Sequence, residues 1–505
     1  MPEHIRALIV ILLLATAVFA FAEIPATAIA MDRRDFVRRR NLWFAITLIA
    51  FLAHNFWIYI VVTAALLLFV VSREPNPLAM YFFVLFAVPT FSAEISGLGL
   101  IRFFFSIGYL RLLALTVLLP TYLLLRAQPG TERFGRLLPD KLIIGYLGLN
   151  LMLQIQVDTF TNALRVGAFY AFTDVFLPYY VASRSLKNLR QFRGALMGFV
   201  LAALILSAVG AFEYARHWLL YGSLESALGV KWGYGIYLSR AEDLRAVAST
   251  GQPIPLGYVM AIAIGFCFYL RRSVSNQMLW GLGLLLLTAG LMAPLSRGPW
   301  VGAAAMLVVF VVLGPAPGRR LAILGAIGAI AVPILLVTPI GEKLVSMLPF
   351  VGSVDEGNVT YRQRLLEIGI QVILQRPLFG AFDFMYSPAI QALRQGEGII
   401  DIVNTYLGVA LSGGLVALFL FVGFFVAVGI GIFKSLRKVS DIASEVHLLG
   451  ETLLSTLVGI LVIISTVSSI TVIPVVYWSV AGIGVAYARM LATPQSTSVA
   501  TGILQ

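Results

Sequence analysis

Long apolar runs alternate with short charged segments along almost the whole chain. Most runs have about 16 to 20 residues, enough for a helix to cross a hydrocarbon layer of about 30 Å. A backbone exposed to lipid must satisfy its own hydrogen bonds, so we expect these runs to be helices. The pattern predicts an all-α, polytopic transmembrane helical bundle with about 12 to 15 spans, roughly 14 of them after Leu42.

Composition supports this prediction. The 505 residues are 60% hydrophobic and 12% charged, whereas soluble domains carry roughly 25% charged residues. The single cysteine, Cys267, lies within an apolar run, so one chain offers neither a disulfide nor a thiolate metal site. The first 30 residues have features of a signal peptide, but we interpret them as a first span or a re-entrant helix.

Arginine and lysine residues predict an orientation. Basic side chains near short loops are retained on the cytoplasmic side of a membrane. More than half of the 36 basic residues fall in one alternating set of loops, with clusters at 33–40, 126–141, 184–193, 271–272, 319–320 and 434–438. We expect these loops to be cytoplasmic. The net charge of +12 is then mostly an orientation signal and does not indicate a nucleic-acid partner.

Two longer loops are predicted on the opposite, outer side. They divide the chain into four parts: N-terminal transmembrane helices (1–160), central transmembrane helices with a first outer loop at 214–255 (161–338), a large second outer loop with amphipathic helices (339–403), and C-terminal transmembrane helices (404–505). Arginines on the outer side run against the orientation signal. They are therefore the candidates for function.

Arg297 lies in the segment Ser296-Arg297-Gly298-Pro299, between two apolar runs with barely any loop. An arginine at the membrane surface is costly unless it faces a wet cavity or an anion. Snorkelling to lipid phosphate is the alternative interpretation. The Gly-Pro pair favours a turn and a helix start, which tips the interpretation toward function.

The first outer loop contains Arg240 and Arg245, followed by the turn-rich segment Ser249–Pro255. We expect this segment to fold over the mouth of a pocket. The alternative is a solvated loop in which Glu242 and Asp243 neutralise the two arginines.

The second outer loop has an amphipathic pattern that predicts a short helix on the outer face, ending near Pro377. It carries Arg362, Arg364 and Glu367. Arg364 and Glu367 are three residues apart and fit a plain surface pair. An arginine fork is also well suited to hold a diphosphate, so several outer arginines indicate a phosphorylated lipid head group.

Asp401 and Asn404 lie three residues apart at the start of the next span. Asp401 is either a helix N-terminal charge stabilised by the helix dipole or a general base for a sugar hydroxyl. The sequence has no Walker-type phosphate loop, and its four histidines are scattered. ATP-driven transport and metal catalysis are therefore not indicated.

At these residues the chain resembles the O-antigen ligase and polysaccharide polymerase superfamily of bacterial inner membranes. The resemblance covers roughly Asn162 to Gly413, including a similar segment at 161–179. Its motifs are Ser296-Arg297-Gly298, the loop with Arg362 and Arg364 that leads to Arg376-Pro377-Leu378-Phe379-Gly380, and Asn404-Thr405-Tyr406-Leu407 followed by Ser412-Gly413-Gly414-Leu415.

The resemblance implies an inverting, metal-independent glycosyltransferase without a cofactor. Its substrates would be glycans on undecaprenyl diphosphate at the periplasmic face of the inner membrane, with the bilayer, a flippase and a chain-length regulator as partners. Arginines would bind the diphosphate and stabilise its departure, with Asp401 or Glu367 as base. The catalytic candidates are Arg297, Arg364, Arg245, Asp401 and Glu367, and the substrate-binding candidates are Arg362, Arg165, Arg240, Asn404 and Tyr406.

One departure from the family pattern affects the choice of activity. Ligases that attach glycan to the lipid A core commonly carry His-Asn where this chain has Val403-Asn404. We therefore favour a polymerase of exopolysaccharide or O-antigen over a ligase. A transporter is the third alternative, but its polar residues would lie within several spans, often in inverted repeats, whereas here they lie in two outer loops.

Overall fold

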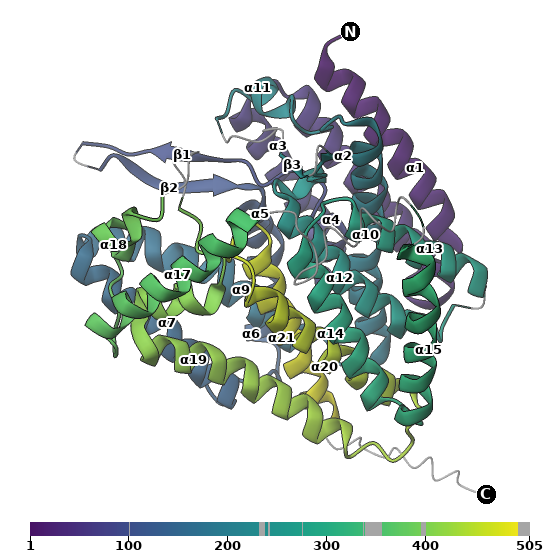
Figure 1. Cartoon of the computed structure of the whole chain (residues 1–505). Helices are drawn as coiled ribbons and strands as arrows, with labels where there is room; N and C mark the ends of the chain where they lie inside the picture. The colour runs from purple at the N-terminus through teal and green to yellow at the C-terminus, as the bar shows by residue number, and fades with distance from the viewer. Residues whose placement is uncertain are drawn as a thin grey trace, which may run out of the picture.

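The computed structural model describes residues 1–99, 101–231, 238–240, 243–274, 276–336, 338, 356–394 and 400–492. Glu242 of the first predicted outer loop and residues 339–355 and 395–399 of the second lie outside the described residues. The described chain is mostly helical and confirms the all-α polytopic prediction (Figure 1).

The elements follow one another in a long helical series. Its N-terminal half contains α1 (Glu3–Ile29), α2 (Arg33–Leu52), α3 (Phe56–Val71), α4 (Pro77–Val84), β1 (Ser92–Ser96), β2 (Phe103–Gly108), α5 (Tyr109–Leu113), η1 (Ala114–Leu118), α6 (Leu119–Ala127), α7 (Leu138–Val157), α8 (Phe160–Asn162), η2 (Ala163–Ala168), η3 (Ala171–Phe176), α9 (Leu177–Ser185), α10 (Leu189–Arg216) and α11 (Leu224–Leu228). The remainder contains β3 (Ser239–Arg240), β4 (Asp243–Leu244), η4 (Ala248–Thr250), α12 (Pro253–Leu270), α13 (Gln277–Met292), α14 (Arg297–Leu313), α15 (Pro317–Leu336), α17 (Glu356–Gln375), η5 (Phe384–Tyr386), α18 (Pro388–Gln391), α19 (Thr405–Leu436), α20 (Glu445–Ile464) and α21 (Ile473–Ala492).

Seven helical segments of the described chain are long and apolar enough to cross a membrane. They are α1, the continuous stretch from α5 to α6, α10, α12, α19, α20 and α21. Three shorter apolar helices, α3, α13 and α14, have 16 or 17 residues. Fewer helices reach full spanning length than the apolar runs predicted, because some runs fold into shorter helices and one contributes the strand β2.

The strands form two antiparallel hairpins, β1–β2 and β3–β4. The β1–β2 hairpin projects beyond the helices on the same side of the view as α17 and α18 (Figure 1). Its register pairs Ser92 with Gly108 and is irregular between Glu94 and Ser96. The all-helical pattern did not predict this hairpin.

The helices α14 and α20 pack closely because small residues face each other. A side chain on Gly459 would meet Met306 Cβ at 2.9 Å and the carbonyl oxygen of Gly302 at 3.1 Å. Small residues of this kind let two helix backbones approach in a membrane protein. The approach places the first residue of α14, Arg297, beside the end of α20, where Gly298 packs against Thr466.

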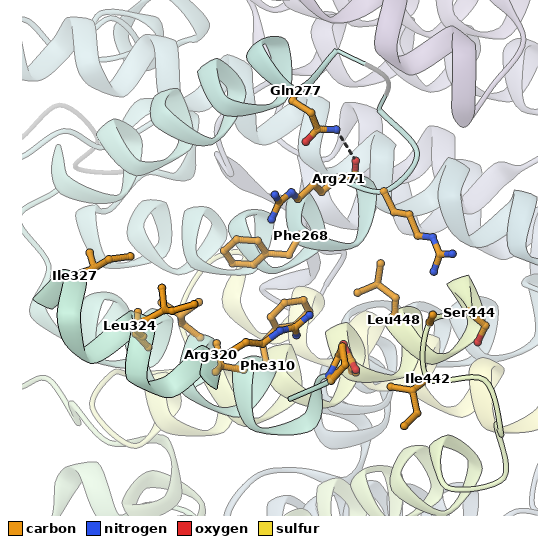
Figure 2. A pocket seen from close by; sticks show the side chains of 17 residues that line it. Phe268, Arg271, Gln277, Phe310, Arg320, Leu324, Ile327, Ile442, Ser444 and Leu448 are labelled. Atoms are coloured by element: carbon orange, nitrogen blue, oxygen red, sulfur yellow. Dashed lines mark hydrogen bonds between the residues drawn. The ribbon is translucent and has the colours of Figure 1, made fainter. Parts of the chain in front are cut away.

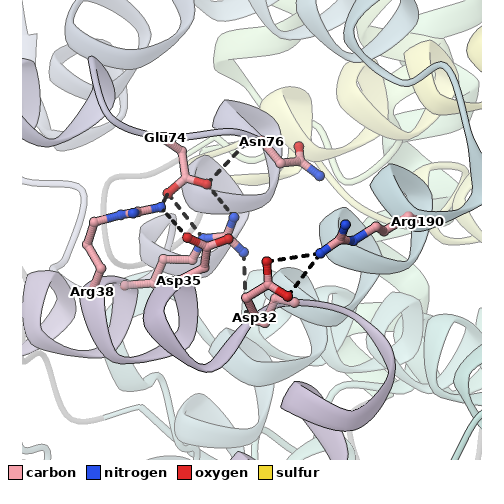
Figure 3. Close-up of polar contacts among 8 residues, drawn as sticks. Asp32, Asp35, Arg38, Glu74, Asn76 and Arg190 are labelled. Carbon is pink, nitrogen blue, oxygen red and sulfur yellow. Dashed lines mark hydrogen bonds and ion pairs between the residues drawn. The ribbon is translucent and has the colours of Figure 1, made fainter.

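Ion pairs connect the start of α2 to the loop after α3 (Figure 3). Arg39 and Glu74 form a salt bridge whose side chains are almost fully buried. Arg38 contacts Glu74 and Asp35, each at 2.8 Å. Removing one member of such a pair would leave an uncompensated buried charge, so the network fixes the loop after α3 against α2.

The helix α19 contains a sharp break at Gly414, where φ is +69° and ψ is −169°. The segment after α17 satisfies the backbone groups that the break frees. Leu415 N–H donates to Pro377 O at 2.8 Å, and Ala381 N–H donates to Leu411 O at 2.9 Å. Gly380 has φ of +62° and lies so close that a side chain there would meet Gly414 N at 2.6 Å. The positive φ angles and the close backbone contact explain why glycine occupies both positions. The same contact fixes the segment after α17 against α19.

Candidate active site

Four segments meet near Arg297: the start of α14, the helix α17, the segment 400–404 and the connection between α20 and α21. Arg362 Nη1 donates to Thr466 O at 3.1 Å. The hydroxyl of Thr405 donates to Val467 O at 2.9 Å and lies 3.0 Å from the hydroxyl of Ser469. The α20–α21 connection is therefore the common partner of the other segments.

Asp401 is held from two sides. The phenol of Tyr361 donates to Asp401 O at 2.9 Å and accepts from Asp401 N–H at 3.1 Å. The hydroxyl of Ser468 donates to the carboxylate of Asp401. Asn404 is the N-cap of α19, and its side chain accepts from Leu407 N–H at 3.1 Å. Asp401 thus lies before the cap, and its carboxylate is held by a hydroxyl from the α20–α21 connection.

Arg362 lies in the electrostatic field of two other candidate residues. Loss of surrounding water lowers the pKa of Arg362 below its usual value; the negative charge of Asp401 opposes this change, and the positive charge of Arg297 adds to it. The loss of water is the largest of these effects, and a bound anion would stabilise the charged guanidinium against it. The structure therefore brings Arg297, Arg362 and Asp401 together in one site.

Arg240 and Arg245 contact the turn that precedes Arg297. Arg245 donates to Pro294 O at 3.1 Å and to Ser296 Oγ at 3.0 Å. Arg240 donates to Leu295 O at 2.6 Å, and Leu295 has an unusual φ of +49°. Both arginines thus hold the strained turn from which Arg297 projects. Their predicted contact with substrate stays a prediction.

Asp243, one of the two carboxylates considered as neutralising partners, lies opposite Arg240 in the β3–β4 register. It also accepts a hydrogen bond from the phenol of Tyr214 at 3.2 Å. The other, Glu242, lies outside the described residues.

Arg364 and Glu367 are exposed on α17, and so is Arg362. The opposite side of this helix packs in a small apolar cluster: Leu365, Val372, Ile390, Leu393, Leu407 and Leu411. The amphipathic helix predicted from the sequence is therefore present, and it rests on the first turns of α19. The structure brings Arg362, rather than Arg364, into contact with the α20–α21 connection.

Arg165 is bound to the β1–β2 hairpin. It donates to the carbonyl oxygens of Phe103 and Phe104 on β2 and to Asn162 Oδ1 at 2.8 Å. Arg165 therefore links η2 to the strand β2 through these hydrogen bonds. Its predicted role in substrate binding stays a prediction.

Tyr406 adjoins an apolar cavity of about 300 Å³, lined also by Leu418, Val422, Phe425, Val426 and Leu461. Its hydroxyl donates to Leu461 O at 3.0 Å. Tyr406 thus borders an apolar space between α19 and α20.

Sequence reasoning did not identify Tyr361, Thr466 or Ser468, which complete the site. The one local signal for Thr466 and Ser468 is the hydroxyl-rich run Ser465-Thr466-Val467-Ser468-Ser469 between two apolar spans. Such a run also fits an ordinary loop. Among the described residues, no group of three or more His, Cys, Asp or Glu side chains is placed to hold a metal ion.

Residues 282–422 match the family model described as O-antigen ligase. The matched segment contains Arg297, Arg362, Arg364, Asp401 and the break in α19. The match supports the resemblance to the O-antigen ligase and polymerase superfamily that the sequence motifs indicated. The family supports ligase- or polymerase-type transfer of lipid-linked glycans by this multi-pass membrane protein. No curated protein matches the sequence.

Proposed function

We propose that the protein joins oligosaccharide repeat units linked to undecaprenyl diphosphate into exopolysaccharide or O-antigen. The reaction takes place at the periplasmic face of the bacterial inner membrane. The observation that carries the proposal is the meeting of Arg297, Arg362 and Asp401 inside the family-matched segment. Two cationic forks beside one positioned carboxylate fit a reaction with an anionic leaving group and a hydroxyl nucleophile.

In the proposed reaction, an acceptor sugar hydroxyl attacks the anomeric carbon of the donor glycan from the side opposite the diphosphate. The new glycosidic bond forms as the bond between the anomeric carbon and the phosphate oxygen breaks. Its electron pair leaves with undecaprenyl diphosphate, and the hydroxyl proton passes to the carboxylate of Asp401. Attack from the opposite side inverts the anomeric configuration.

Arg297 and Arg362 act on the diphosphate. Negative charge increases on the leaving oxygen in the transition state, and preorganised cations near that oxygen lower the barrier. Arg362 is already fixed by Thr466 O, and Gly298 packs against Thr466 at the start of α14. Arg362 and the start of α14, which carries Arg297, are therefore both fixed against the same connection.

Asp401 is the proposed base because Tyr361 and Ser468 fix its backbone and its carboxylate. A fixed carboxylate loses little freedom when the acceptor binds. Glu367, on the exposed side of α17, is the alternative base. The proposed chemistry uses arginine charge and a carboxylate, and it requires neither a metal nor a cofactor.

The polymerase proposal is tested by deleting the gene and analysing the lipid-linked glycans. We expect single repeat units on the carrier and loss of long polymer, with restoration by the intact gene. Persistence of long polymer would contradict the proposal. A flippase and a chain-length regulator encoded nearby would supply the substrate and limit the product.

Ligase activity is the second candidate, favoured by the description of the matching family. Val403 precedes Asn404 where lipid A core ligases commonly carry histidine, which favours the polymerase. The same deletion separates the two. Loss of a ligase leaves polymer of normal length that is not attached to its acceptor.

A further inference from the structure

A second cavity, of about 750 Å³, lies at the other end of α14 from Arg297 (Figure 2). The end of α12, the start of α13, the end of α14, the start of α15 and the start of α20 surround it. The α14 residues that line the cavity, Leu307, Phe310 and Val311, follow Arg297 along the helix, so the two sites lie about 15 to 21 Å apart. This cavity is therefore separate from the candidate active site.

Three arginines line the cavity: Arg271, Arg272 and Arg320. The guanidinium of Arg271 lies 5.0 Å from the ring centre of Trp280, which limits its freedom. Arg320 packs against Gly314, where a side chain would collide with its guanidinium. The cations thus come from the α12–α13 connection and from the first turn of α15, and they converge on one space.

One carboxylate, Glu451, also lines the cavity. Its Oε1 lies 2.9 Å from Nδ1 of His447, and its charge interacts with that of Arg320. Three arginines against one glutamate leave the cavity with a positive balance. An anion, rather than a neutral or zwitterionic group, complements this charge.

The remaining walls are apolar. Phe268 and Phe310 are stacked with ring centres 5.3 Å apart, and both line the cavity. Ile323 and Ile327 on α15 line it as well, although they are 50% and 58% exposed. Residues 321–336 of α15 are all apolar, glycine or proline, so in the membrane its exposed apolar side chains would lie against lipid tails. The cavity is therefore continuous with the space that acyl chains fill.

We propose that this cavity is a binding site for an anionic phospholipid. The phosphate lies among Arg271, Arg272 and Arg320, and an acyl chain lies along Phe268, Phe310 and the exposed face of α15. Basic pockets between membrane helices suit such head groups. These arginines could serve only to orient the protein in the membrane, which requires no more than positive charge in a loop. Here, however, they also line a cavity with apolar walls. Both arginine-bearing loops belong to the set predicted to be cytoplasmic, which places the lipid in the inner leaflet.

The test uses the purified full-length protein in detergent, with bound lipid counted by native mass spectrometry. The probes are dioleoyl phosphatidylglycerol, dioleoyl phosphatidylcholine, dihexanoyl phosphatidylglycerol and inorganic phosphate. We expect dioleoyl phosphatidylglycerol to bind at least about tenfold more tightly than the other three probes, since each lacks either the charge or the long chain. If both dioleoyl lipids bind equally, or if inorganic phosphate binds as tightly as dioleoyl phosphatidylglycerol, the proposal is overturned.

Two variants make the test specific to the site. Arg320→Gln removes a cation that lines the cavity and should weaken phosphatidylglycerol binding about tenfold, as expected for one charge-assisted hydrogen bond. Arg319→Gln removes the same charge one residue away, outside the lining, and should bind like the unmodified protein. An equal loss of phosphatidylglycerol binding in both variants would show that binding depends on net charge alone. That result would contradict a specific site.

Discussion

The phenol of Tyr361 on α17 bonds both backbone groups of Asp401, donating to its carbonyl oxygen at 2.9 Å and accepting from its N–H at 3.1 Å. One side chain thereby fixes the peptide that carries the proposed base. The amphipathic helix α17 and the segment before α19 consequently behave as one unit. In this arrangement α17 positions catalytic groups in addition to carrying arginines.

Tyr361→Phe removes both of these hydrogen bonds while keeping the ring. Each is worth about 1 kcal/mol, so we expect kcat to fall about tenfold or more with little change in KM. Glycan transfer by purified protein measures both quantities. Tyr386→Phe is the control because Tyr386 is 83% exposed. An unchanged kcat for Tyr361→Phe would show that the position of Asp401 does not depend on the phenol.

Asp401→Asn keeps the shape of the side chain and removes its basicity. General base catalysis contributes roughly 10² to 10⁴ in rate, so we expect turnover to fall by that factor while lipid-linked donor still binds. Glu367→Gln should retain most of the activity. If the effects of the two variants are reversed, Glu367 is the base and Asp401 has only a structural role.

Arg362→Ala removes the cation that contacts Thr466 O. Loss of one group that stabilises transition-state charge typically costs about 10² to 10³ in rate, and long polymer should disappear. From the sequence we expect Arg364→Ala to abolish polymer formation too.

Arg394→Ala is the matched control for these two variants, because Arg394 lies after α18, where it donates to Gln391 at 2.6 Å. We expect it to change polymer length little. Polymer analysis in a deletion strain compares all three at equal membrane abundance. Equal loss in all three variants would refute the distinction between site and surface arginines.

Gly380→Ala tests the contact between the segment after α17 and the break in α19. Alanine at a φ of +62°, beside Gly414 N, should lower the free energy of unfolding by about 1 to 3 kcal/mol. Thermal unfolding of purified protein measures the change. Gly408→Ala, in the first turns of α19, is the control. An added side chain there meets only Ile402 at an ordinary 3.5 Å, so the free energy of unfolding should change little. Similar unfolding temperatures for both variants would show that the close approach of Gly380 to Gly414 does not stabilise the fold.

Local patterns predicted much of the fold. Apolar run length indicated the membrane helices, and the amphipathic spacing around Leu365 predicted α17 with its buried side. The Gly-Pro pair correctly indicated a helix start, since α14 begins at Arg297. Each of these features depends on neighbours a few residues apart, which is why the sequence alone reveals them.

The parts that the sequence did not reveal depend on distant contacts. Ser468 holds the carboxylate of Asp401 across 67 residues, and a serine in a loop has no local signature of that task. The break at Gly414 is stable because Pro377 and Leu378 accept its freed N–H groups. Arg165 matched a family segment, yet its visible contacts are with β2, a strand that the apolar pattern did not predict.

The central claim is that Arg297 stabilises the departing diphosphate. Its most direct test is the rate of polymer formation by purified protein in vesicles supplied with undecaprenyl-diphosphate-linked repeat units. We predict that Arg297→Ala lowers the rate at least about 10²-fold, and that Arg297→Lys restores only part of it because a point charge does not reproduce a planar fork. A rate for Arg297→Ala within about twofold of the unmodified protein, at equal reconstitution, would contradict the claim.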